Sequence, residues 1–174
     1  ESIYYPSDFQ TPLAEYESVT INRMALEYSS NDSATIHDVP LTIYLGETDK
    51  KAYETYNWGC VAASEWMPLE NMTKVFDGTV STTVGENNKL VIPFSEKFQY
   101  NPKKNLVMTI ACAGNAAEHA DGNSYPILYN HFCVCDPNNY DTPVYRQVLY
   151  EGKTAPYDYV SEVKYCAKSY VPVL

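Results

Sequence analysis

The 174 residues of this chain suffice for one domain with a buried core, and 22 acidic against 12 basic residues give a formal net charge of −10. An acidic chain without a basic stripe is repelled by nucleic-acid backbones, which argues against DNA or RNA as a partner. No apolar run approaches the length of a membrane span, so membrane insertion is not expected. The 45% hydrophobic and 20% charged residues are typical of a globular chain.

The first part of the chain alternates short apolar runs with turn residues, as half-buried strands do. In the clearest case, Val39, Leu41, Ile43 and Leu45 share one face of a strand and should point into the core. The elements expected before residue 54 are strands over 2–5, 21–28 and 39–45, a helical turn over 12–17, and a helix over 49–53 capped by Thr48.

The best-patterned stretch is 89–115, which reads as two strong strands joined by an aromatic corner and a polar loop. Leu106, Met108, Ile110 and Cys112 share one face of the second strand. Pro93 closes the first strand, over 89–94. A strand over 74–77, a second extended piece after Gly78 and a hairpin turn over 85–88 precede this stretch, and strands over 127–135, 145–150, 160–170 and 171–174 follow it.

Eight or nine short strands, turn signals and no long amphipathic helix predict an all-β fold. The spacing favours an antiparallel β-sandwich with jelly-roll topology and a few short helical turns in loops. No linker divides the chain, so residues 1–174 are expected to form a single domain.

The first long loop is the candidate ligand site. Sugar sites in β-sandwiches combine aromatic rings with amides and carboxylates, and this region carries Tyr53, Tyr56, Asn57, Trp58 and Trp66. The alternative is that the two tryptophans close the end of the core.

A second group of polar residues predicts a structural calcium site, because hard cations take six to eight oxygen ligands. The same residues also make ordinary turns without a metal. The candidate ligands are Glu118, Asp121, Asn123, Asp136, Asn138 and Asp141.

Five cysteines leave at least one unpaired within the chain, and both buried thiols and one or two disulfides remain open. His131, Cys133 and Cys135 share a strand face and could bind zinc, although the usual CxxC spacing is absent. Core thiols beside a hydrogen-bonded histidine are the alternative.

Catalytic motifs are missing from the sequence. It has neither a G-x-S-x-G elbow nor an H-E-x-x-H helix, so no catalytic residues are assigned. A hydrolase built from converging carboxylates or a Cys–His pair is the low-ranking alternative.

A series of motifs supports a resemblance: SIYYPSDF, INRMALEY, PLTIYLGETDKKAY, WMPLENMTKVFDG, KLVIPFSEKFQY and NLVMTI. Over about residues 2–115 the chain resembles jelly-roll ectodomains of exported and surface proteins of anaerobic Gram-negative bacteria, similar to cleaved-adhesin domains. These motifs are structural and transfer no catalytic residue. The cysteines, above all those at 133 and 135, depart from the pattern.

The resemblance implies a secreted or cell-surface module excised from a larger exported bacterial protein. Its expected partner is a carbohydrate or a host or matrix protein, together with neighbouring domains of the same chain. The alternative is an accessory domain that positions a neighbouring protease or hydrolase.

Overall fold

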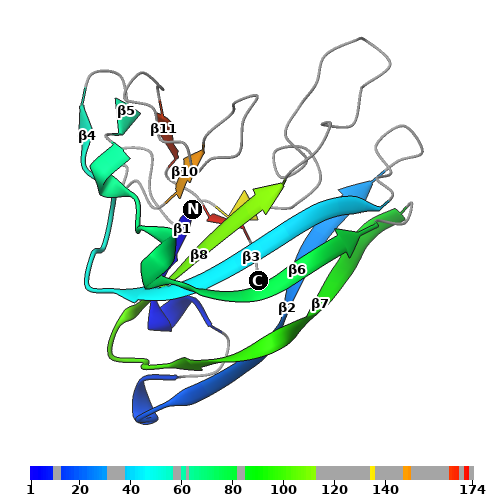
Figure 1. Ribbon diagram of the computed structural model, residues 1–174, viewed down its shortest axis with the longest axis horizontal. Coiled ribbons are helices and arrows are strands. Elements are labelled where there is room, and N and C mark those ends of the chain that lie inside the picture. The colour runs from blue at the N-terminus through cyan, green and yellow to red at the C-terminus, as the bar shows by residue number, and fades with distance from the viewer. Residues whose placement is uncertain are drawn as a thin grey trace.

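The structure, a computed structural model, describes residues 1–9, 13–30, 38–56, 60–61, 63–81, 85–112, 134–135, 147–149, 165–168 and 171–172. Within them nearly all regular structure is β-strand, which confirms the predicted all-β class (Figure 1). The strands are β1 (Ser2–Tyr4), β2 (Val19–Ser30), β3 (Val39–Thr48), β4 (Thr55–Tyr56), β5 (Cys60–Val61), β6 (Thr73–Val80), β7 (Gly85–Tyr100), β8 (Asn105–Cys112), β9 (Val134–Cys135), β10 (Gln147–Leu149), β11 (Tyr165–Lys168) and β12 (Val171–Pro172). The short 3-10 helices are η1 (Pro6–Asp8), η2 (Leu13–Glu15), η4 (Ala63–Glu65) and η5 (Leu69–Asn71).

Among these residues the strands form one eight-stranded sheet in the order β4-β5-β11-β10-β1-β8-β3-β6, and two two-stranded sheets, β2-β7 and β9-β12. Neighbouring strands run antiparallel throughout the described pairs. β1 lies inside the large sheet, where Ser2 is opposite Met108 of β8 and Gln147 of β10. Figure 1 shows the β2-β7 ribbon crossing beneath the β8-β3-β6 side of that sheet.

The alternation in β3 is as the sequence predicts. Leu41, Ile43 and Leu45 have exposed fractions of 1%, 0% and 2%, and the intervening Thr42 and Tyr44 are partly exposed. A period of two follows from the pleat, since successive side chains point to opposite faces of a sheet. β3 therefore presents one apolar face to the ribbon and one mixed face to the other side.

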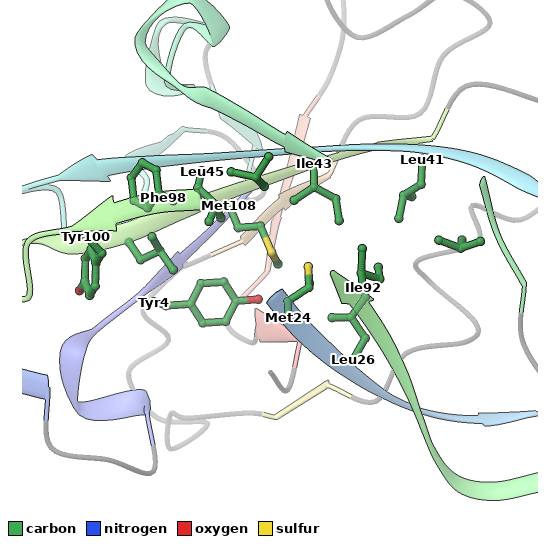
Figure 2. Close-up of a cluster of buried hydrophobic side chains, with 13 residues drawn as sticks. Tyr4, Met24, Leu26, Leu41, Ile43, Leu45, Ile92, Phe98, Tyr100 and Met108 are labelled. Carbon is green, nitrogen blue, oxygen red and sulfur yellow. The ribbon is translucent and has the colours of Figure 1, made fainter. Parts of the chain in front are cut away.

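The large sheet and the β2-β7 ribbon share one hydrophobic cluster (Figure 2). Met24 and Leu26 of β2 are both buried there together with Ile92 of β7. They point toward Leu41 and Ile43 of β3 across the space between the sheets. The two strands of the best-patterned stretch, β7 and β8, thus belong to different sheets and contribute to the same core.

Two expectations about β7 are wrong. Gly85 to Asn88 do not form the hairpin turn, because they pair with β2, Gly85 opposite Ser30 and Asn88 opposite Tyr28. The strand also continues beyond Phe94 to Tyr100 instead of ending at an aromatic corner. Pairing with β2 along its length overrides the local turn preference of glycine and asparagine, as tertiary context does for strand propensities generally.

Of the remaining expected elements, η2 lies within the helical turn expected over 12–17, and β10, β11 and β12 lie within their expected ranges. Of the strand expected over 127–135, the structure describes β9 alone. The strand expected over 74–77 is part of β6, which runs without interruption through Gly78.

Tyr100 closes the core at the end of β7. Its ring is fully buried and its hydroxyl donates a 2.6 Å hydrogen bond to the carbonyl of Lys104. Burial, with the charges of Glu47 and Asp8, raises the pKa of Tyr100 from 10.0 to about 12. As the pH rises above 10, the Tyr100 hydroxyl therefore loses its proton in the unfolded chain before it does so in the folded protein.

We expect Tyr100→Phe to cost about 1 kcal/mol at neutral pH, because the Lys104 carbonyl loses its donor. Folding raises the pKa of Tyr100, so the contribution of its hydroxyl to the free energy of unfolding is present below pH 10 and falls as the pH rises toward 12. The difference in free energy of unfolding between parent and variant should therefore shrink over that interval. Urea titrations at pH 8, 10 and 11 measure it, and a constant difference would contradict the assignment.

Candidate functional site

A recess of about 290 Å³ lies where the chain between β3 and β6 folds over the start of β1 and β8. It is at the small end of ligand pockets, which span roughly 300–1,000 Å³. One wall is the 63–72 segment, which carries η4 and η5, and the other comes from the end of β3 and the chain after it. The polar residues in its lining include Glu1, Glu47, Thr48, Lys50, Tyr53, Ser64, Glu65 and Asn71.

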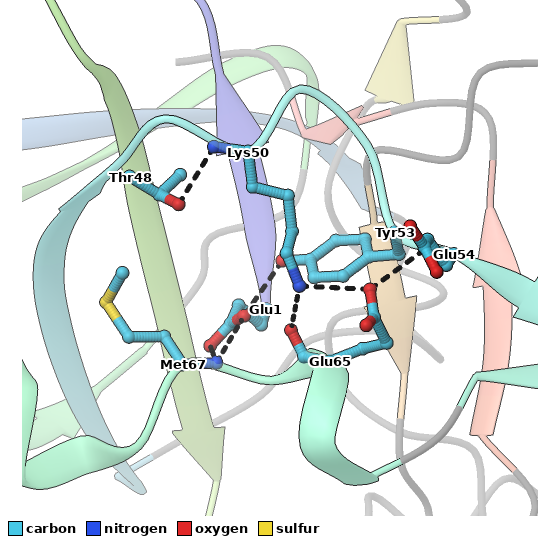
Figure 3. Close-up of polar contacts among 7 residues, drawn as sticks. All are labelled: Glu1, Thr48, Lys50, Tyr53, Glu54, Glu65 and Met67. Carbon is cyan, nitrogen blue, oxygen red and sulfur yellow. Dashed lines mark hydrogen bonds and ion pairs between the residues drawn. The ribbon is translucent and has the colours of Figure 1, made fainter.

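The carboxylate of Glu1 lies at the inner end of the recess. Glu1 as a whole is 8% exposed. Its carboxylate accepts hydrogen bonds from the Tyr53 hydroxyl at 2.9 Å and the Met67 N–H at 3.1 Å (Figure 3). The Thr109 hydroxyl donates a third, at 2.9 Å. Three donors from three separate segments stabilise a charge that burial alone would make costly. Glu1 thereby connects β1, β8 and both walls of the recess.

The same arrangement changes the pKa of Tyr53. Burial, the negative charge of Glu1 and the hydrogen bond to it raise the pKa of Tyr53 well above its ordinary value of 10.0. The phenol therefore stays protonated and remains a donor to Glu1 across the physiological range.

Lys50 and Glu65 form a second polar pair at the side of the recess. The Lys50 ammonium donates to the Glu65 carboxylate at 2.9 Å and to the Glu65 carbonyl at 2.8 Å, and the Glu54 N–H donates to the same carboxylate at 2.9 Å. The ammonium also lies 5.8 Å from the centroid of the Tyr53 ring. Figure 3 shows Lys50 reaching across from one wall to η4 on the other.

We expect Glu65→Gln to remove part of the acid sensitivity of the fold. Burial opposes ionisation of Glu65, but the Glu54 N–H and the Lys50 ammonium outweigh it and lower the pKa of Glu65 from its ordinary 4.5. A lowered pKa means that the stabilisation is present above pH 4.5 and is lost as the pH falls through the folded value. Parent and variant should thus converge in free energy of unfolding on acidification, which denaturation at a series of acidic pH values measures. If acidification lowers the free energy of unfolding equally in the parent and in Glu65→Gln, the prediction is wrong.

The helix expected over 49–53 is absent from the structure. The Thr48 hydroxyl does accept the Lys50 N–H, at 3.1 Å, but as a local turn that no helix follows. The chain beyond it is held by side chains from elsewhere: Asn105 donates to the Lys50 carbonyl at 2.9 Å and Tyr5 to the Lys51 carbonyl at 2.6 Å. These long-range bonds satisfy backbone carbonyls that a helix would have used internally.

Several hydrogen-bonding groups at the recess are not used by the described part of the chain. Ser64 and Asn71 are exposed, and their side chains make no hydrogen bond there. Glu47 accepts the Asn101 N–H through Oε1 at 2.6 Å, which leaves Oε2 available within the same part of the chain. The recess thus offers donors and acceptors side by side.

The predicted ligand-binding residues fall into three groups. Tyr53 and Trp66 line the recess, but they are 4% and 7% exposed, so neither ring is an open stacking surface. The burial of Trp66 fits the alternative in which tryptophan closes the end of the core. Tyr56 lies in β4, while Asn57 and Trp58 lie outside the described residues.

The predicted metal ligands are not covered by the structure. The calcium candidates Glu118, Asp121, Asn123, Asp136, Asn138 and Asp141 all lie outside the described residues, as do His131 and Cys133 of the zinc candidate. Within the described residues no group of three or more His, Cys, Asp or Glu is placed to hold a metal ion.

Two cysteines far apart in the sequence are opposite each other in the large sheet. Cys60 of β5 is the register partner of Cys166 of β11. Directly opposed residues of antiparallel strands have Cα atoms about 4.5–5.5 Å apart, within the range of disulfide-linked residues. The backbone at these two positions therefore permits a disulfide.

Four residues of the site were not singled out by sequence patterns: Glu1, Lys50, Glu65 and Thr109. They come from the residue before β1, the loop after β3, η4 and β8, and only the strand pairing brings them together. No helix among the described residues is long and apolar enough to cross a membrane.

Comparison with protein-family models, with curated proteins and with solved structures finds no match to this chain.

Proposed function

We propose that this chain is a non-catalytic β-sandwich module of an exported protein that binds a carbohydrate at the recess between the 63–72 segment and the end of β3. The observation that carries the proposal is the set of unused polar groups there. Ser64, Asn71 and Glu47 offer a hydroxyl, an amide and a carboxylate oxygen around one small hollow.

A sugar suits such a lining because each of its hydroxyls both donates and accepts. An amide such as that of Asn71 can do the same in return, and a carboxylate such as that of Glu47 accepts only. The Lys50 ammonium has three donor hydrogens. Two of them bond to the carbonyl and the carboxylate of Glu65, so the third is available to a ligand. The recess volume suits one ring better than an extended chain.

The strand pairings support the jelly-roll arrangement of this module. A jelly roll is a long hairpin folded over, so that the first strand pairs with the last and the inner strands pair in turn. The pairs β1 with β8, β2 with β7, β3 with β6, and β4 with β5 follow that nested order. The departures are that β1 also pairs with β10 and β5 with β11, which places β4 and β5 in the large sheet.

A glycan array followed by calorimetry with the best ligand tests the proposal. The double variant Ser64→Ala, Asn71→Ala should bind at least about tenfold more weakly, because two hydrogen bonds of about 1 kcal/mol each are lost. Glu96→Gln, at an exposed position on β7, is the matched control and should bind as the parent does. Absence of binding to any glycan, or equal affinity of the double variant, would overturn the carbohydrate assignment.

The second candidate function is an accessory domain that holds a neighbouring protease or hydrolase in place. At the inner end of the recess the Glu1 carboxylate already has three donors from this chain, namely Tyr53, Met67 and Thr109. This version predicts no glycan binding, but a loss of activity of the full-length protein when the domain is deleted. A host or matrix protein as ligand would instead give binding that survives Ser64→Ala, Asn71→Ala.

A further inference from the structure

Two methionines cross the backbone of β3 at a glycine. A Cβ atom added to Gly46 would lie 2.5 Å from Met67 Sδ and 3.2 Å from Met72 Cγ. Real Cβ contacts are essentially never as short as the first distance, and the second is tighter than most, so the missing side chain provides the space that the two methionines occupy. This contact holds both ends of η5 against the sheet.

The same methionines are linked to the buried carboxylate. The Met67 N–H donates to Glu1, and the Thr109 hydroxyl lies 2.9 Å from Glu1 Oε2 and 3.5 Å from Met72 Sδ. One hydroxyl has one proton, and the shorter bond to a charged acceptor takes it. The Met72 sulfur therefore faces an oxygen whose proton is already engaged, in a closely packed polar corner.

Exposure separates the four methionines of the chain into two pairs. Met24 and Met108 are buried, at 8% and 2% exposed, and belong to the core cluster. Met67 and Met72 are half-buried, on the 63–72 segment. An oxidant in solution reaches the second pair first, because oxidation follows exposure.

We propose that Met67 and Met72 form an oxidation-sensitive contact that controls whether the 63–72 segment stays on the sheet. A peroxide transfers one oxygen atom to the thioether sulfur; the sulfur loses two electrons, hydrogen peroxide is reduced to water, and methionine becomes its sulfoxide. The added polar oxygen does not fit the space above Gly46, and at Met72 it meets an oxygen whose proton is engaged by Glu1. The segment then separates from β3, and the recess loses a wall.

This inference concerns the segment itself and does not depend on a ligand in the recess. The experiment treats the full chain with hydrogen peroxide, quantifies each sulfoxide by peptide mass spectrometry, and follows Trp66 fluorescence in a Trp58→Phe background. We expect Met67 and Met72 to be oxidised before Met24 and Met108, and the Trp66 emission to shift to longer wavelength. Cleavage by a glutamyl endopeptidase after Glu65 and Glu70 should accelerate at least about tenfold, because it follows the population of the open segment.

The matched control is Met67→Leu, Met72→Leu, which keeps apolar side chains above Gly46 and retains all five cysteines and both core methionines. It should show no peroxide response, and methionine sulfoxide reductase should restore the parent. If the double variant fails to fold, Met67→Leu alone should give a smaller response than the parent. The proposal is overturned if both sulfoxides form without a change in fluorescence or cleavage, if the core methionines react first, or if the leucine variant responds like the parent.

Discussion

Replacement of Glu1 by alanine should lower the free energy of unfolding by about 3 kcal/mol, because buried donors lose their common acceptor. The hydroxyls of Tyr53 and Thr109 belong to residues that are 4% and 3% exposed and would be left without that acceptor. The Met67 N–H would lose its bond as well, so the 63–72 segment should also become more susceptible to proteases. Chemical denaturation followed by circular dichroism measures the first effect.

The control for this prediction is Glu70→Ala, which removes the same charge from an exposed position in η5. Its cost should stay within about 0.5 kcal/mol, as for most surface substitutions. Glu1→Gln should lie between the two, since its carbonyl oxygen still accepts but its NH₂ group would face a donor. Equal effects of Glu1→Ala and Glu70→Ala would show that the carboxylate network does not stabilise the fold.

Ile92→Ala in β7 should cost about 3 kcal/mol, the middle of the range for deleting a buried isoleucine side chain. Ile92 is 2% exposed and packs in the cluster shared by the ribbon and the large sheet. The cost combines the lost transfer energy with that of the cavity left between the two sheets.

The neighbouring Val91 provides the matched control, because it is 53% exposed on the other face of the same strand. Val91→Ala should cost no more than about 0.5 kcal/mol. This pair tests the pairing register of β7 with β2, in which Met24 is opposite Ile92. A slip by one residue would move every side chain to the other face and reverse the order of the two effects.

The parts of the fold that the sequence predicts are those with a local signal. In β3 the alternation of Leu41, Ile43 and Leu45 with polar or mixed residues can be seen in a short stretch of sequence, and these three side chains are buried in the structure. The turn expected at Gly85 also had a local signal, but hydrogen bonding with Ser30 and Tyr28 in β2 outweighs it. Strand pairing partners are distant in sequence, so local preference alone could not predict the length of β7.

The candidate site likewise contains residues that a local sequence signal predicts and residues that only long-range strand pairing brings in. Tyr53 and Trp66 were singled out as aromatic residues near a long loop, and they do line the recess, although as buried rings. Glu1 and Thr109 carry no motif, and their hydrogen bond exists because β1 pairs with β8. Sequence patterns cannot identify residues that only strand pairing brings together.

The position of β1 has a consequence for biosynthesis. Ser2–Tyr4 forms hydrogen-bonded pairs with β8 on one side and with β10 on the other, so both neighbours are synthesised long after it. At roughly 5–20 residues per second, β1 waits for several seconds with both edges open before β8 leaves the ribosome. Such non-local pairing folds slowly and leaves unpaired edges exposed during the wait. Efficient production of this domain should therefore depend on a chaperone that covers the nascent chain until Gln147 has emerged.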